Sequence, residues 1–102
     1  MTNFILAMTE AELLASVKEI VHRYLGTDVQ IVLFGSRATG NSVEFSDYDI
    51  GLRAEEPIEP LAMARIYDEI EALPILRQVD IVDLSKVTKR FYNTAMAKTR
   101  AI

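Results

Sequence analysis

The stretch that decides the fold is VQIVLFGSRATGNSVEFSDYDIGL, residues 29–52. It opens with a short apolar run over 29–34 that is rich in β-branched residues and stops at Gly35, as a buried strand does. The polar residues 35–40 then separate this run from a second expected strand over 47–52. The stretch therefore predicts two strands joined through a short, glycine-bounded loop.

Helical patterns flank this stretch on both sides. Thr9 followed by Glu12 has the spacing of a capping box, and apolar residues then recur at helical intervals as far as Gly26. A second helical pattern runs over 61–73, between one proline suited to a helix beginning and another suited to its end. We expect an amphipathic helix in each place.

The remaining signals complete the order of elements. Asn41-Ser42 has turn composition, residues 79–84 read as a third strand, and Ser85 is placed to cap a last helix. The expected order is α-β-(short α)-β-α-β-α. It predicts an α/β (α+β) fold with helices packed on a small mixed sheet, in one domain over 1–102, and ligands at the strand ends.

Composition limits the function classes. The net charge of −4 disfavours a broad nucleic-acid-binding surface. Because the chain has no cysteine, any metal must be held by oxygen ligands or by the lone His22, which favours magnesium or manganese. His22 itself is expected on a solvated helix face, outside the site. The apolar residues 4–8 are too short to span a membrane, so a cytoplasmic protein is expected.

Three aspartates are the candidate chemical groups. Asp47 and Asp49 lie two apart in an expected strand, so both carboxylates leave one face about 7 Å apart while Tyr48 points into the packing. Asp80, on the third expected strand, can supply another carboxylate to the same cation, whereas Asp83 should leave the opposite face in a structural role. Each aspartate alone is more simply a solvated strand-end residue, and only the combination favours a metal site.

The dipeptide Gly35-Ser36 is the candidate phosphate-binding element. It follows a buried strand, so its backbone N–H groups and the Ser36 hydroxyl can face a phosphate with no Cβ in the way. A plain turn is an equally good reading of the dipeptide alone. The carboxylate pair about a dozen residues later favours phosphate binding.

Together these parts resemble the minimal nucleotidyltransferases of the DNA polymerase β superfamily. Their signature is Gly-Ser, a short spacer and Asp-x-Asp, followed by an aspartate on a later strand. This chain has GSRATG over 35–40, SDYDIG over 46–51 and VDIVDL over 79–84. The resemblance covers residues 29–84, and the length and final helix also look like the stand-alone bacterial members.

The resemblance implies an activity and a set of roles. Gly35, Ser36 and Arg37 would bind a nucleoside triphosphate such as ATP, while Asp47, Asp49 and Asp80 would be the metal-binding and catalytic carboxylates. Two Mg²⁺ ions are expected, with Mn²⁺ able to substitute. The reaction would transfer a nucleoside monophosphate, AMP in the case of ATP, to an acceptor hydroxyl, with Asp80 able to activate that hydroxyl.

The resemblance also implies a partner protein. A chain this short has room for a nucleotidyltransferase core but not for a separate acceptor-recognition domain. Stand-alone relatives are commonly paired with a small helical HEPN-type protein, sometimes as toxin and antitoxin with a partner tyrosine as the acceptor, so a hetero- or homo-oligomer is expected. The alternative is a non-catalytic module that binds and neutralises such a partner.

Overall fold

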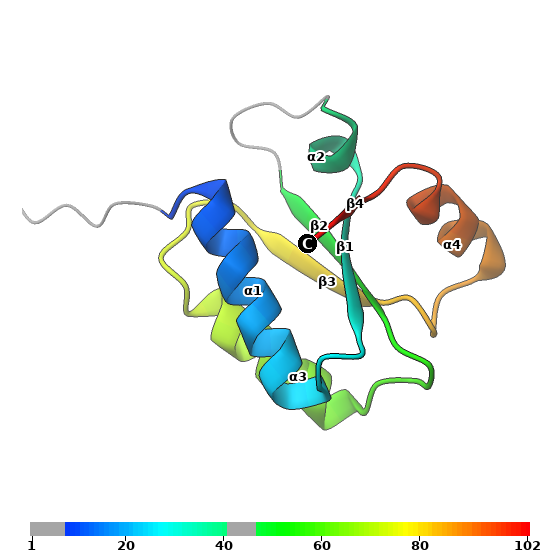
Figure 1. Cartoon of the computed structure of the whole chain (residues 1–102), viewed down its shortest axis with the longest axis horizontal. Coiled ribbons are helices and arrows are strands. Elements are labelled where there is room, and N and C mark those ends of the chain that lie inside the picture. The colour runs from blue at the N-terminus through cyan, green and yellow to red at the C-terminus, as the bar shows by residue number, and fades with distance from the viewer. Residues whose placement is uncertain (1–7, 41–46) are drawn as a thin grey trace, which may run out of the picture.

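A computed structural model describes residues 8–40 and 47–102, and its elements follow the expected order with one addition (Figure 1). The elements are α1 (Glu10–Leu25), β1 (Gln30–Phe34), α2 (Ser36–Thr39), β2 (Tyr48–Arg53), α3 (Pro60–Glu71), β3 (Val79–Asp83), α4 (Lys89–Met96) and β4 (Arg100–Ala101). The addition is β4, which is too short to show a periodicity in sequence. The turn expected at Asn41-Ser42 lies outside the described residues.

The strands form one mixed sheet in the order β3-β2-β1-β4. β1 is antiparallel to β2 and to β4, whereas β2 and β3 run parallel because α3 crosses between them. The expected α/β fold with a small mixed sheet is therefore confirmed. No helix in the described part of the chain is long and apolar enough to cross a membrane.

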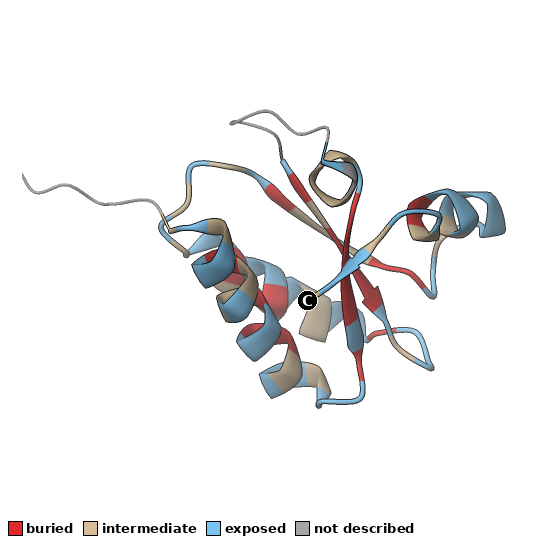
Figure 2. Cartoon of the chain, turned by 45° about the horizontal axis from the view of Figure 1, so that its top comes forward, coloured by how far each residue is buried: buried red, intermediate tan, exposed pale blue. Residues whose placement is uncertain are grey.

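The two faces of the sheet have different neighbours. α1 and α3 lie side by side against one face, and α4 lies beyond the other (Figure 1). Ile31, Leu33 and Ile50 are buried in the core shared with α1 and α3, whereas the residues between them point the other way. Figure 2 shows this buried interior and the largely exposed surface of α4. The face away from α1 and α3 is therefore the one on which functional side chains can meet a ligand.

The helix caps confirm one expectation and correct another. The Thr9 hydroxyl accepts a hydrogen bond from the Glu12 N–H at 3.1 Å, and the Glu12 carboxylate accepts one from the Thr9 N–H at 3.0 Å, so the capping box is confirmed. Ser85 does not cap the last helix: Thr88 does, by accepting the Phe91 N–H at 3.1 Å. The Ser85 hydroxyl instead donates to the Asp83 carboxylate at 2.7 Å, a charge-assisted bond that fixes a turn before α4.

Asp83 has the structural role expected of it. Its side chain is buried, and its carboxylate also accepts the Ile58 N–H at 2.8 Å and the Ser85 N–H at 2.9 Å. Burial favours the neutral acid, but the hydrogen bonds from Ser85 and Ile58 together with Lys86 hold the pKa of Asp83 below its ordinary value. Asp83 thus joins the end of β3 to the loop that leads into α3.

Replacing Asp83 with asparagine should lower the free energy of unfolding by about 1–3 kcal/mol at neutral pH, because buried donors lose a charged acceptor. A lowered native pKa stabilises the fold above the ordinary carboxyl pKa, and that stability is lost as pH falls through the native pKa. The deficit of the variant should therefore shrink in acid. Urea titrations at pH 7 and at acid pH measure it, with exposed Asp68→Asn as the control; equal deficits at both pH values would contradict the prediction.

Candidate functional site

Three side chains form a row across the sheet on the face away from α1 and α3. Phe34 on β1 is paired with Asp49 on β2, and Asp49 is paired with Asp80 on β3. Paired residues on neighbouring strands point to the same face and lie about 5 Å apart. The structure thus brings together two of the predicted carboxylates, one on a central strand and one on the edge strand β3.

Asp47 lies just before this row. The alternation had placed Asp47 inside the second strand. The structure begins β2 at Tyr48, so Asp47 is an exposed residue just before the strand. Its charge still acts on the site. Burial raises the pKa of Asp49, and the negative charges of Asp80 and Asp47 raise it further. The three predicted carboxylates therefore form one electrostatic cluster.

The donor chemistry of this cluster suits a magnesium or manganese ion. Carboxylate oxygens are the ligands that these hard cations prefer, and a divalent cation would relieve the repulsion that raises the pKa of Asp49. Within residues 8–40 and 47–102, no three carboxylate or imidazole groups are already gathered closely enough to hold a metal. A cation would therefore have to draw these flexible side chains together.

His22 lies outside the carboxylate cluster, as expected, but it is not a solvated surface residue. Its side chain is half-buried, and its Nε2 is 3.2 Å from the backbone carbonyl oxygen of Val29. The imidazole thereby ties the end of α1 to the segment that begins β1. A structural role explains this residue.

Gly35 is in direct contact with the carboxylate row. Its backbone has φ +73°, in the region that favours glycine, and a Cβ built on it would lie 2.5 Å from Oδ2 of Asp49. The sequence suggested that a side chain here would obstruct a triphosphate. The structure adds a nearer reason: the carboxylate of Asp49 already occupies the space beside the Gly35 backbone.

We predict that Gly35→Ala displaces the Asp49 carboxylate and weakens binding of ATP with magnesium by about tenfold or more. The flexible end of the Asp49 side chain can turn away, so the fold should survive. Gly26→Ala is the matched control, because Gly26 has φ +88° but nothing within 4 Å of a built Cβ. Calorimetric titration measures the dissociation constants, and equal values for Gly35→Ala and Gly26→Ala would reduce Gly35 to a turn residue.

The two other predicted nucleotide-binding residues begin α2 and follow Gly35 directly. Ser36 and Arg37 are both half-buried. The Arg37 guanidinium carbon lies 4.3 Å from the centre of the Tyr48 ring, a cation–π contact with a residue that is buried as expected. This contact holds a positive charge beside the residue that separates Asp47 from Asp49. This cation–π contact could not be predicted from the sequence, because Arg37 and Tyr48 belong to different elements.

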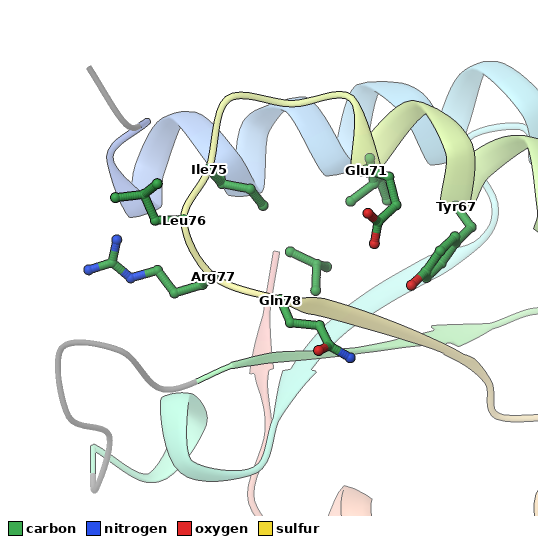
Figure 3. Close-up of a pocket in the computed structure, with 8 residues that line it drawn as sticks. Tyr67, Glu71, Ile75, Leu76, Arg77 and Gln78 are labelled. Carbon is green, nitrogen blue, oxygen red and sulfur yellow. The ribbon is translucent and has the colours of Figure 1, made fainter. Parts of the chain in front are cut away.

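A hollow of about 370 Å³ lies between α3 and the segment that leads into β3 (Figure 3). The Gln78 side-chain amide lines it and donates a hydrogen bond to Oδ1 of Asp80 at 2.8 Å. Tyr67 and Glu71 project into it from α3, and their hydrogen bond, Glu71's charge, burial and Asp80's charge raise the pKa of Tyr67. Gln78 was missed from sequence, although the two-residue spacing to Asp80 places both side chains on one face of an extended segment.

Comparisons with known proteins identify the family to which the chain is similar. Residues 15–102 match the family described as polymerase beta, nucleotidyltransferase. The chain is 32% identical over 91 residues to a probable protein adenylyltransferase MntA of Haemophilus influenzae, covering 89% of this chain and 79% of that protein. These matches concern nearly the whole chain.

Solved structures share the fold. One provisionally assigned minimal nucleotidyltransferase superposes with a TM-score of 0.68 at 26% identity, covering 93% of this chain and 97% of that one. A complex of a tri-AMPylated Shewanella oneidensis HEPN toxin with an MNT antitoxin gives 0.69 at 16% identity, covering 91% and 71%. A toxin–antitoxin structure with AMP-PNP gives 0.70 at 18%, covering 91% and 72%.

Proposed function

Because the chain belongs to the polymerase beta nucleotidyltransferase family, we propose that it transfers AMP from ATP to a tyrosine hydroxyl of a small HEPN-type partner. The observation that carries the proposal is the in-register pair of Asp49 and Asp80 directly beside Gly35. The name of the Haemophilus relative supports adenylyl transfer, and the AMPylated toxin in a structural neighbour supports the choice of partner. The chain would then act as the antitoxin of such a pair.

Asp49, in the middle of the row, and the residues around it would hold the nucleotide. Asp47 and Asp49 would bind magnesium, for which manganese is the natural substitute, and the adjoining loop would place Gly35, Ser36 and Arg37 along the triphosphate. Magnesium, when bound, neutralises the phosphates and stabilises the departing pyrophosphate. The raised pKa of Asp49 supports a cation there, because burial and the nearby carboxylates both disfavour the negative charge of Asp49.

The edge of the sheet would receive the acceptor. Asp80 lies on the edge strand β3 and accepts a hydrogen bond from Gln78, which lines the same hollow as Tyr67. The acceptor oxygen would attack the α-phosphorus, its proton would pass to Asp80, and the bond from the α-phosphorus to pyrophosphate would break. Tyr67 and Leu76, which are 40% and 77% exposed, offer apolar surface to a partner beside this point.

A labelling experiment tests the proposal. The purified chain is incubated with the short helical protein encoded by an adjacent gene, magnesium and ATP carrying label on the α-phosphate. We expect label on the partner, none when the label is on the γ-phosphate, and none when the partner's acceptor tyrosine is changed to phenylalanine. Mass spectrometry of the partner identifies the modified residue.

The same mixture separates the enzyme from its alternative. Tight binding of the partner without transfer of label would overturn the proposal and support a non-catalytic neutralising module. Label on the partner that persists in the Asp49→Asn variant would show that the carboxylate row is not the active site. Arg53→Gln, at the far end of β2 from Asp49, serves as the matched control and should transfer normally.

A further inference from the structure

We propose that a second hollow, between the end of β1 and α4, binds the nucleobase of the triphosphate and that Phe91 stacks on it. The inference rests on the proposed function, because it places the base of that same substrate. The hollow has a volume of about 280 Å³. It is lined by Phe34, Gly35, Phe91, Thr94, Ala95, Ala97 and Lys98.

The position of the hollow fits one end of a bound nucleotide. Gly35 lines the hollow and also abuts the Asp49 carboxylate. Phe34, which also lines the hollow, is the in-register neighbour of Asp49 and so lies about 5 Å from it on the same face. Phosphates held at Gly35 and Asp49 would therefore leave the base of the same molecule beside the Phe34 and Phe91 rings. On the opposite flank of Asp49 lies Asp80, where the acceptor is proposed.

The chemistry of the hollow fits a flat aromatic ring. Its lining is mostly apolar side chain, and its volume is near the lower limit of about 300 Å³ for ligand pockets, a size for one heterocycle. Phe34 packs edge-to-face on Phe91, with ring centres 6.1 Å apart and an angle of 85° between the planes. Phe34 is nearly buried, whereas Phe91 remains 43% exposed. Phe91 is thus braced by Phe34 while part of its surface is open to a base.

The polar groups of the hollow suit a nucleobase, and ring size favours a purine. The Thr94 hydroxyl donates to the Arg90 carbonyl at 3.0 Å, so its oxygen is left to act as an acceptor, and the Lys98 ammonium can only donate. All four nucleobases present donors and acceptors on their edges, so these groups can bind any base. The two fused rings of adenine and guanine cover more of an aromatic face than a pyrimidine does. ATP and GTP should therefore bind more tightly than CTP and UTP.

Substitution of Phe91 tests the stacking contact. With magnesium present, Phe91→Ala and Phe91→Leu should weaken ATP binding by about tenfold while leaving inorganic tripolyphosphate within about twofold of the wild type. Phe91→Tyr should keep ATP affinity, because it keeps the ring. Leu keeps the apolar packing on Phe34, so it guards against a folding defect in the alanine variant. Leu61→Ala, which removes a 57% exposed side chain on α3, is the control.

A fluorescent reporter gives a second readout. The chain has no tryptophan, so Phe91→Trp introduces a single indole at the proposed stacking surface. ATP should quench its emission, CTP should do so less, and tripolyphosphate should leave it nearly unchanged. Purine preference should also disappear in the alanine variant.

The outcomes separate this inference from the proposed function. Equal ATP affinity of Phe91→Leu and the wild type, or equal quenching by ATP and tripolyphosphate, would overturn the base site even if label reached the partner. A loss of tripolyphosphate binding as large as the loss of ATP binding would also overturn it, because Phe91 would then only support the loop. Failure of the proposed function would appear instead as ATP binding without transfer of label.

Discussion

Replacing Asp49 with asparagine is expected to lower AMP transfer by at least about a hundredfold while leaving the fold intact. Asp49 is the central carboxylate of the row, between Phe34 and Asp80, and its Oδ2 lies against the Gly35 backbone. Asparagine keeps the size of the side chain but removes the charge that would hold a cation there. The Asp47→Asn variant should also lose transfer, because Asp47 is proposed to bind the same ion. Single-turnover transfer of α-label measures the loss.

Thermal stability should move in the opposite direction. A carboxyl group whose native pKa is raised stabilises the fold below its ordinary pKa, and this contribution is lost as pH rises through the native pKa. At neutral pH without metal, Asp49 is therefore an unfavourable charge, and Asp49→Asn should melt at the same temperature as the wild type or higher. The difference should vanish in acid, where Asp49 is protonated.

The Asp83→Asn variant provides the contrast. It makes the same chemical change at a carboxylate that lies outside the row and accepts hydrogen bonds from the Ile58 and Ser85 N–H groups. This variant should lose stability at neutral pH. If Asp49→Asn transferred nucleotide at the wild-type rate in magnesium, Asp49 would not be an active-site carboxylate. If Asp47→Asn and Asp49→Asn both unfolded, the two residues would have a structural role.

The elements that sequence predicted well are those whose signals are local. The capping box of Thr9 and Glu12, the apolar run of β1 and the proline at the start of α3 each act within a few residues. β4 was missed because its two residues become a strand only by pairing with Val32 and Leu33, far away in the chain. Ser85 and Thr88 could both serve as caps. The Ser85 hydroxyl bonds to the buried Asp83 carboxylate instead, and Thr88 caps α4.

The same distinction applies to the candidate site. The spacing of Asp47, Asp49 and Asp80 indicated a shared site, and the parallel pairing of β2 with β3 brings the last two together. The roles assigned to them stay predictions. Neither the contact of Gly35 with Asp49 nor the hydrogen bond from Gln78 to Asp80 could be predicted, because each depends on the tertiary packing of the chain and on side-chain conformation. The hollow beside α4 could not be predicted for the same reason.

Asp80 should differ in role from Asp49, because it reaches the row from the edge strand and accepts a hydrogen bond from Gln78, which lines the same hollow as Tyr67. Asparagine at position 80 keeps size and hydrogen bonding but cannot accept the proton of the acceptor hydroxyl. We therefore expect kcat to fall by about a hundredfold or more for Asp80→Asn while ATP binding changes far less. Asp49→Asn should instead lose metal-dependent ATP binding together with transfer.

The comparison requires ATP affinity and single-turnover transfer for both variants at one magnesium concentration. Gln78→Ala distinguishes the general base, Asp80, from the residue that positions it. The variant removes the 2.8 Å hydrogen bond to Oδ1 of Asp80 but keeps the Asp80 carboxylate, so its transfer should fall less than that of Asp80→Asn. Suppose that Asp80→Asn weakened ATP binding as much as Asp49→Asn yet kept full transfer at saturating ATP. Asp80 would then bind on the nucleotide side, and the proton of the acceptor would have to leave by another group.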